Sequence, residues 1–217
     1  MQHNHPAIVI GSGGHAKVLL DCLINQGHRI LFVTDVDESQ YGKLLLGVEI
    51  KGGDDLIEDW NPQDVILVNG MGSVGVPAHR KNIFDLWTQK GYRFASIIHS
   101  TAIVSKTAKI ETGVQVMAGA VIQAGVTLGA NSIINSGSTV DHDCHIGRHC
   151  HIAPKVALSG SITVADCSHV GTAACVIQGI SIGQRCVVGA GATVIRDLSD
   201  DTTVVGTPAK PILKNES

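Results

Sequence analysis

Side chains that could do chemistry are concentrated between residues 141 and 151, in the segment Asp-His-Asp-Cys-His-Ile-Gly-Arg-His-Cys-His. Within it, His142 is followed directly by Asp143. A carboxylate beside an imidazole fixes the tautomer of the ring and favours its protonated form, which makes the ring a stronger base. The spacing therefore indicates His142 as a candidate general base and Asp143 as the acid that supports it.

A second candidate site is the segment Gly-Ser-Gly-Gly-His-Ala-Lys at residues 11–17, which follows a short apolar run and opens a helical pattern. Peptide N–H groups at a helix N-terminus attract phosphate, and glycine lets the backbone approach it closely. Asp35 ends the next apolar run and could accept hydrogen bonds from a ribose or a base. The pattern predicts a nucleotide site, and a tight turn without a ligand is the alternative.

The elements that position the first site form a repeat. Every sixth residue from Ile98 to Val194 is Ile, Leu or Val, at all 17 positions. Four places after each of these lies a small or aliphatic residue, never a charged one. Gly often follows the aliphatic residue directly, as at Gly129 and Gly147, where we expect it to supply the unusual dihedral angles of tight corners. A period of six is typical of a β-helix in which three hexads form one triangular coil, and the stretch from 98 to 199 predicts five to six coils.

The repeat also indicates whether the histidines and cysteines of this segment bind a metal. Four His and two Cys between positions 141 and 151 suggest a zinc site. The repeat, however, points Cys144 and Cys150 into the packed interior on successive faces. Their spacing also matches no known zinc-binding pattern. We therefore expect no metal. His145 and His149 are expected on the surface. His151 and His169 are three hexads apart, so we expect them to lie in one column on neighbouring coils.

The N-terminal part lacks the six-residue repeat and has a different sequence pattern. Strands are expected at 7–10, 29–34 and 65–68, and helices at 15–26 and 77–90, an alternation that implies a parallel sheet. Fewer than about 100 residues precede the repeat, which is room for one half of a doubly wound dinucleotide fold, so one nucleotide fits better than a dinucleotide. We predict an α/β nucleotide-sugar-binding domain with a Rossmann-like parallel sheet at 1–95. An all-β left-handed parallel β-helix with a C-terminal tail is predicted at 96–217.

Composition excludes several classes of protein. The chain is 44% hydrophobic, 16% charged and 3% aromatic, which excludes a disordered chain and disfavours a helix bundle. The formal net charge of −3 gives no sign of nucleic-acid binding. No stretch approaches the roughly 18 apolar residues of a transmembrane helix. The six cysteines form no CxxC pair, and we see no export signal, so a cytoplasmic protein with reduced thiols is expected.

Three motifs in order, GSGGHAKV, INSGSTVDHDCHIG and VVGTPAK, together with the repeat, resemble the sialic acid O-acetyltransferase-type sugar acyltransferases. That family includes the N-acetyltransferases of nucleotide-linked 4-amino sugars in the bacillosamine and perosamine pathways. The resemblance implies a homotrimer with sites at the subunit interfaces, acetyl-CoA as co-substrate and a nucleotide-linked 4-amino-4,6-dideoxy sugar as acceptor. It also implies a role in surface glycan biosynthesis.

The resemblance also implies roles for individual residues. His142 and Asp143 would be the base and its acid. The acetyl-CoA contacts would be Asn135, His151, Gly160, Thr172 and Ala190, with the Gly160 N–H facing the thioester oxygen. The nucleotide-sugar contacts would be Gly13, Gly14, His15, Asp35 and Gly52.

Three other functions stay open at this stage. An O-acetyltransferase acting on a sialic acid or a related sugar hydroxyl is the nearest alternative. A β-helix zinc enzyme of the γ carbonic anhydrase kind would need His spacings that we do not find. A binding protein without catalysis would keep the fold but lack the acetyl-CoA groove.

Overall fold

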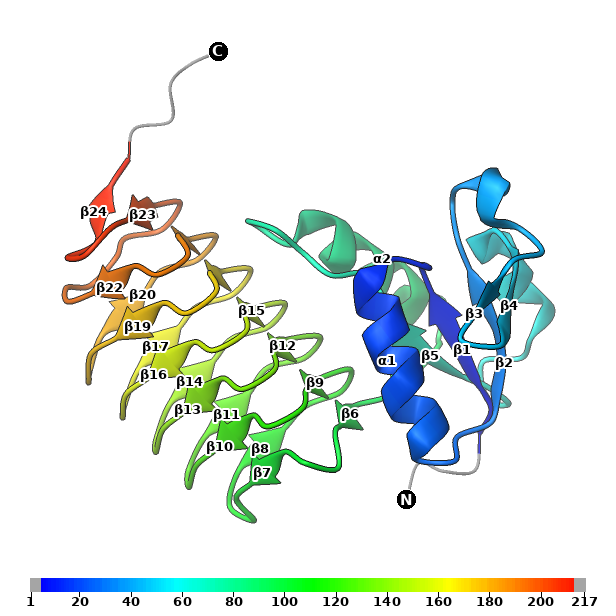
Figure 1. Cartoon of the computed structure of the whole chain (residues 1–217), viewed down its shortest axis with the longest axis horizontal. Helices are drawn as coiled ribbons and strands as arrows, with labels where there is room; N and C mark the ends of the chain where they lie inside the picture. The colour runs from blue at the N-terminus through cyan, green and yellow to red at the C-terminus, as the bar shows by residue number, and fades with distance from the viewer. Residues whose placement is uncertain (1–4, 213–217) are drawn as a thin grey trace.

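The computed structural model describes residues 5–212. An α/β domain forms the N-terminal part, and a stack of triangular coils forms the rest (Figure 1). Among the described residues, no helix is long and apolar enough to cross a membrane.

The N-terminal sheet has the strand order β3-β4-β2-β1-β5. Pairing is parallel from β4 to β5, and β3 is antiparallel to β4. The strands are β1 (Ala7–Ile10), β2 (Ile30–Thr34), β3 (Leu44–Leu45), β4 (Val48–Gly52) and β5 (Ile66–Asn69), and the helices are α1 (Gly14–Asn25) and α2 (Ala78–Gln89). The expected helices and strands lie within one residue of α1, α2, β1, β2 and β5. The sequence patterns did not indicate β3, β4 or the 3-10 helices Glu38–Gln40 and Asp54–Asp59.

The order of the strands decides where a ligand can bind. β1 lies between β2 and β5, so the chain moves to one side of β1 first and to the other side later. Where strand order reverses in this way, a crevice opens at the carboxyl ends of the strands. That crevice is at Ile10–Gly14, where the glycine-rich segment leads into α1.

The coils give the prism three faces, which we number in chain order. The first face contains β6 (Ile97–Ile98), β9 (Gln115–Val116), β12 (Ile133–Ile134), β15 (His151–Ile152), β18 (His169–Val170), β21 (Val187–Val188), β23 (Thr203–Val205) and the antiparallel β24 (Lys210–Pro211). The second contains β7 (Ile103–Val104), β10 (Val121–Ile122), β13 (Thr139–Val140), β16 (Ala157–Leu158), β19 (Cys175–Val176) and β22 (Thr193–Val194). The third contains β8 (Lys109–Ile110), β11 (Thr127–Leu128), β14 (His145–Ile146), β17 (Thr163–Val164) and β20 (Ser181–Ile182).

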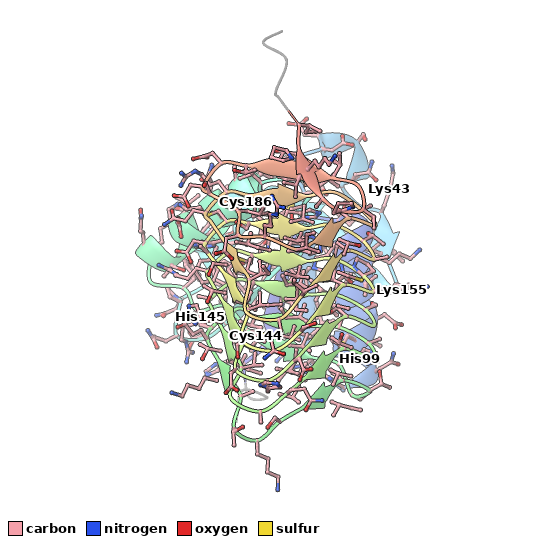
Figure 2. The ribbon with its side chains drawn as sticks, turned by 90° about the vertical axis from the view of Figure 1, so that its left-hand side faces the viewer. Lys43, His99, Cys144, His145, Lys155 and Cys186 are labelled. Atoms are coloured by element: carbon pink, nitrogen blue, oxygen red, sulfur yellow. The ribbon has the colours of Figure 1, made fainter. Side chains whose placement is uncertain are left out.

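Faces meet at three edges, also numbered in chain order: first to second face, second to third, and third to first. Figure 2 views the prism from the side away from the N-terminal domain, with Lys155 of the first edge and His145 beyond the second edge at opposite margins. Neighbouring strands on one face are separated by three hexads of sequence, as in the pairing of Val140 with Leu158. The fold is therefore the left-handed parallel β-helix that the period predicts.

The interior is formed by the two inward columns that the repeat predicts. From residue 114 to 194, the aliphatic residues at every sixth position and the small residues four places later are buried in one continuous core. Cys144 and Cys150 belong to the small column and are buried, as expected. The coil shortens only at its end, where Ile182 pairs with Leu198 rather than with the residue three hexads on, because the chain leaves the frame of the repeat after Val194.

The corners correct the expected role of glycine. Residues with φ between 54° and 75° recur at every sixth position from Gly113 to Gly191, and more than half of them are not glycine. The glycines that directly follow the aliphatic column do not supply this conformation. A Cβ on Gly129 would lie 2.5 Å from the carbonyl carbon of Gly147 on the next coil. These glycines are needed because the coils approach closely, not because of their dihedral angles.

The N-terminal domain packs on the first face and the third edge. Arg80 of α2 is buried and donates hydrogen bonds to the carbonyl oxygens of Asn69 (2.9 Å), Met71 (2.7 Å) and Asn131 (3.1 Å). His149 lies beneath Phe84 of the same helix, with ring centroids 5.6 Å apart, and only 3% of it is exposed. The expectation that His149 is a surface residue was wrong, because the docked domain covers its edge of the prism. His145, on the third face, is exposed as expected.

Candidate active site

The two candidate catalytic residues form a pair on the second edge. Nδ1 of His142 is 2.9 Å from Oδ2 of Asp143, and the His142 backbone N–H donates to Asp141 Oδ1 at 2.7 Å. Both side chains are exposed. The hydrogen bond with Asp143 raises the pKa of His142 above its ordinary value. Because Asp143 holds Nδ1, Nε2 is the nitrogen available to take a proton from a substrate.

Two glycines make room for this pair. A Cβ on Gly160, on the next coil, would lie 2.5 Å from His142 Nε2, so the ring rests directly on bare backbone. A Cβ on Gly125, on the preceding coil, would lie 2.5 Å from Asp143 Oδ1. The Gly160 N–H donates no hydrogen bond within the described part of the chain, and its carbonyl accepts from Gly179. A free N–H donor therefore lies beside the proposed base.

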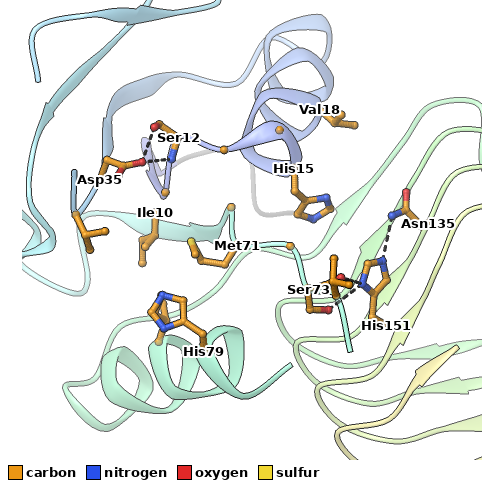
Figure 3. Close-up of a pocket in the computed structure, with 18 of the residues that line it drawn as sticks. Ile10, Ser12, His15, Val18, Asp35, Met71, Ser73, His79, Asn135 and His151 are labelled. Atoms are coloured by element: carbon orange, nitrogen blue, oxygen red, sulfur yellow. Dashed lines mark hydrogen bonds between the residues drawn. The ribbon is translucent and has the colours of Figure 1, made fainter. Parts of the chain in front are cut away.

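A cavity of about 660 Å³ lies at the crevice of the N-terminal sheet (Figure 3). Gly13, Gly14 and His15, at the start of α1, line it. No side chain caps α1, and its first turn contains no acidic residue. The first N–H groups of the helix are thus available to an anion, which is the arrangement that binds phosphate.

Two carboxylates lie in the wall of this cavity. Asp35 accepts from the backbone N–H of Ser12 at 2.8 Å and also from the Ser12 hydroxyl. Burial raises the pKa of Asp35, but these bonds and one from the Asp37 N–H outweigh it, so its pKa lies below the ordinary value. Burial raises the pKa of Asp54, whose Oδ1 accepts from the Thr34 hydroxyl.

The cavity continues onto the β-helix through His151. Nδ2 of Asn135 is 3.1 Å from His151 Nε2, and an amide nitrogen can only donate, so Nε2 accepts and Nδ1 carries the proton. Nδ1 faces the Ser73 hydroxyl (2.9 Å) and carbonyl (3.1 Å). Burial, together with the charges of His169 and His15, lowers the pKa of His151 to about 3. His151 is therefore neutral at physiological pH. As expected, it lies in one column with His169 on the next coil; the two rings meet edge to face, with centroids 4.9 Å apart and an interplanar angle of 90°.

His15 is held in a similar way. Its Nε2 lies 2.7 Å from Gln115 Oε1, whose own amide nitrogen donates to the Asn69 carbonyl at 2.8 Å. Nε2 therefore donates, and the other ring nitrogen is left as an acceptor. Burial lowers the pKa of His15 to about 4, and the charge of Arg80 adds to this effect. The ring is a neutral hydrogen-bonding group in the cavity wall.

The chain does not bring all the candidate residues together. Gly13, Gly14, His15, Asp35, Asn135 and His151 line the cavity. Thr172 and Ala190 follow on the first edge, on successive coils beyond Asn135, and are exposed. His142, Asp143 and Gly160 are on the second edge, outside the cavity. Gly52 does not line the cavity. Its carbonyl oxygen accepts a hydrogen bond from the backbone N–H of Asp35 at 2.9 Å.

Sequence reasoning missed several residues of the cavity wall, among them Asp54, Met71 and Ser73. One signal was available. The segment Gly-Met-Gly-Ser-Val-Gly at 70–75 directly follows β5, and the carboxyl ends of neighbouring parallel strands meet at one edge of a sheet. In residues 5–212, no group of three or more His, Cys, Asp or Glu is arranged to hold a metal ion.

Comparison with known proteins agrees with both parts of the fold. Residues 7–87 match the model of the PglD N-terminal domain, and residues 107–142 match that of the bacterial transferase hexapeptide. A Schizosaccharomyces pombe protein named as an acetyltransferase is 43% identical over 56 residues, 26% of this chain and 27% of that protein. The chain thus matches only about a quarter of the length of such curated relatives.

Solved structures match almost the whole chain. The acetyltransferase domain of PglB from Neisseria gonorrhoeae is 35% identical, with a TM-score of 0.88 over 96% of this chain and 100% of that one. PerB from Caulobacter crescentus, in complex with CoA and GDP-perosamine, is also 35% identical, with a TM-score of 0.87 over 96% and 97% of the two chains.

The fold and these matches define a hexapeptide-repeat acetyltransferase. The chain belongs to the sugar acyltransferases that join a PglD N-terminal domain to a left-handed β-helix, the family to which its motifs pointed.

Proposed function

We propose that the protein transfers the acetyl group of acetyl-CoA to the amine of a nucleotide-linked 4-amino-4,6-dideoxy sugar, in the cytoplasm and in the service of surface glycan biosynthesis. The observation that carries the proposal is the ring of His142 resting on Gly160 with its Nδ1 bound to Asp143. The complex of PerB with CoA and GDP-perosamine supports an amino sugar as acceptor. The complex of the PglB domain with acetyl coenzyme A supports the donor.

The reaction needs no covalent enzyme intermediate. The neutral amine of the sugar attacks the thioester carbonyl carbon, and Nε2 of His142 takes the proton that the amine loses. Negative charge builds up on the carbonyl oxygen, where the Gly160 N–H is the proposed donor; removing one such donor typically costs roughly 3 kcal/mol. The carbon–sulfur bond then breaks, and the CoA thiolate leaves with the proton from His142.

The cavity supports the binding of a nucleotide sugar. The uncapped start of α1 would hold the diphosphate, and Asp35 and Asp54 would accept from N–H or O–H groups of the nucleoside. The sugar would then lie toward Asn135 and His151. Because His151 is neutral and its Nε2 is already an acceptor for Asn135, it would position the acetyl donor rather than exchange protons.

One chain cannot complete this site, because the cavity and the proposed base lie on different edges. The second face lies between those two edges, and its outward column is uncharged: Ile103, Val121, Thr139, Ala157, Cys175 and Thr193. The outward column of the third face contains Lys109 and His145. An exposed uncharged sheet face favours association.

A homotrimer with the second faces toward a three-fold axis would join the two halves. In that arrangement, the second edge of one chain lies beside the first edge of the next. His142 and Gly160 of one chain would then face the neighbour's cavity, and the exposed backbone at Thr172 and Ala190 would line the groove between them. Acetyl-CoA would lie along this groove.

The test is an assay of the purified protein with acetyl-CoA and a panel of nucleotide-linked 4-amino sugars, with a free sialic acid as the O-acetylation control. Release of CoA thiol together with an acetamido product confirms the proposal. Acetylation of the sialic acid alone would favour the hydroxyl-directed alternative. Replacing His142 by Ala should leave both substrates bound and lower kcat by on the order of 10²–10⁴; turnover close to that of the wild type would remove His142 as the base.

A further inference from the structure

The wall of the cavity beside α1 contains acids but no lysine or arginine. Asp35 and Asp54 line it, and neither basic residue is among the described residues that do so. His15 and His151, in the same wall, are neutral because their pKa values are lowered. A diphosphate at the start of α1 would therefore meet two carboxylates and the partial positive charge of a helix N-terminus, roughly half an elementary charge. Binding such an anion requires a further source of positive charge.

Arg80 lies directly behind this wall. Only 1% of it is exposed, and its guanidinium donates to the carbonyl oxygens of Asn69, Met71 and Asn131. Met71 itself lines the cavity. The second terminal nitrogen of the guanidinium, Nη2, is buried and has no hydrogen-bond partner within residues 5–212. The chain thus holds a buried cation one residue behind the surface of the cavity.

No acid of the described chain balances this charge. Over residues 5–212, no carboxylate forms an ion pair with Arg80. Burial lowers the pKa of Arg80 to about 9, so the guanidinium is still protonated at physiological pH. The next residue on α2 differs, because Lys81 is partly exposed and pairs with Asp85 at 2.6 Å. A buried charge without a counter-ion favours the approach of an anion.

The charge of Arg80 reaches a particular part of the cavity. It contributes to the lowered pKa values of His15 and His151. The pKa values of Asp35 and Asp54, by contrast, follow from burial, hydrogen bonds and other charges. The positive charge therefore acts at the start of α1 and toward the β-helix, where the proposed function places the diphosphate and the sugar.

We propose that Arg80 is a positioning residue, whose buried charge attracts the diphosphate of the nucleotide sugar to the start of α1 through the cavity wall and without contact. The inference rests on the proposed function and adds the source of positive charge in the site. Because the guanidinium is buried, salt and water screen it less than they screen a surface cation. Arg80 should therefore strengthen the binding of a nucleoside diphosphate and leave the binding of the nucleoside alone unchanged.

The experiment separates the charge of Arg80 from its hydrogen bonds. R80K keeps the charge and loses most of the bonds to carbonyl oxygens, whereas R80Q keeps a donor and loses the charge. Calorimetry with UDP, GDP and dTDP, and with the matching nucleosides, measures both effects. R80Q should weaken the diphosphate that the wild type binds best by about ten-fold or more, and R80K by less than about three-fold. Nucleoside binding should not change, and K81Q, on the adjacent paired cation, is the matched control.

A second variant neutralises the charge while Arg80 stays in place, and it serves if R80Q does not fold. N131D puts a carboxylate beside the guanidinium, at a corner whose left-handed φ of 60° suits Asp as well as Asn. It is made in an H149Q background, because the imidazole of His149 lies 3.0 Å from the Asn131 amide and could take up the new charge as a proton. Compared with H149Q alone, the double variant should lose diphosphate affinity as R80Q does.

The remaining outcomes would contradict the role of Arg80. Equal losses in R80K and R80Q, or equal losses for nucleosides and their diphosphates, would show that Arg80 only holds the wall in place. Unchanged diphosphate binding in R80Q would show that the positive charge comes from elsewhere. A wild-type protein that binds none of the three diphosphates would instead defeat the proposed function itself.

Discussion

His142 and Gly160 occupy the same corner on successive coils and are in direct contact, with the imidazole of one resting on the α-carbon of the other. The contact exists because three hexads complete one coil of the β-helix, which returns the chain to the same corner. It places the proton-accepting Nε2 beside a peptide N–H that has no partner within residues 5–212. The proposed base and the proposed oxyanion donor are thus fixed relative to each other by the coil itself.

The first prediction concerns this contact. Gly160→Ala would place a methyl group 2.5 Å from Nε2 and must displace the ring. We expect kcat to fall by about 10² or more, with the thermal stability little changed, because Gly160 does not hold a left-handed φ. Gly119→Ala is the control: its Cβ would meet nothing closer than 4.0 Å, and Ala173 already holds the same left-handed φ at an equivalent corner. If both variants retain full activity, the position of the ring is not important for turnover.

The second prediction is a pH profile. A general base must be neutral, so kcat/KM should rise with pH through the pKa of His142 and then level off. The hydrogen bond with Asp143 raises that pKa above the ordinary value of 6.5. Asp143→Asn removes the carboxylate, so the midpoint should move down toward 6.5 while the plateau rate falls. An unchanged midpoint in this variant would show that another group controls the profile.

Nucleotide binding gives the third prediction. Asp35→Ala removes an acceptor from the wall of the cavity and releases Ser12 of the glycine-rich turn that is proposed to bind the diphosphate. We expect the KM for the nucleotide sugar to rise by about ten-fold, with the KM for acetyl-CoA unchanged. Glu38→Ala, an exposed acid on the following 3-10 helix, controls for the change of charge. Steady-state kinetics in both substrates would reveal a wrong assignment as a defect shared by the two KM values.

Assembly is tested by charging the second face. Cys175→Lys places an ammonium group on the uncharged outward column, and three copies would meet near the proposed axis. The proposed trimer should dissociate and activity should be lost, while each chain keeps its fold. Ser181→Lys on the third face is the control and should remain trimeric and active. Light scattering and circular dichroism measure both properties, and an active monomer would refute the shared site.

The fifth prediction is acid sensitivity of the domain interface. Burial lowers the pKa of His149 to about 4, while an unfolded chain has the ordinary value of 6.5. Between these values the unfolded state binds more protons, so stability falls as pH falls from 6.5 toward 4, by roughly 1.4 kcal/mol per pH unit for such a group. His149→Gln should make the dependence of Tm on pH less steep in this window, while His15 and His151, whose pKa values burial also lowers, retain the rest of it. His145→Gln, at an exposed position, should leave the dependence as it is.

The sequence by itself determined the β-helix, the two columns of side chains that point into it and the pair at 142 and 143. The reason is that every strand pairs with the strand three hexads along, so the period of six fixes face, edge and coil together. Length and patterning likewise located β1, α1 and the turn between them, because these depend on neighbours in the chain.

Only the tertiary structure decided what the N-terminal domain covers. Contacts such as Arg80 with Asn131 and Ser73 with His151 join residues 51 and 78 positions apart, and no local pattern encodes them. They bury His149, bring Asn135 to the cavity and leave His142 on a different edge. The separation of the proposed base from the cavity, on which the proposal of a trimer depends, follows from that docking.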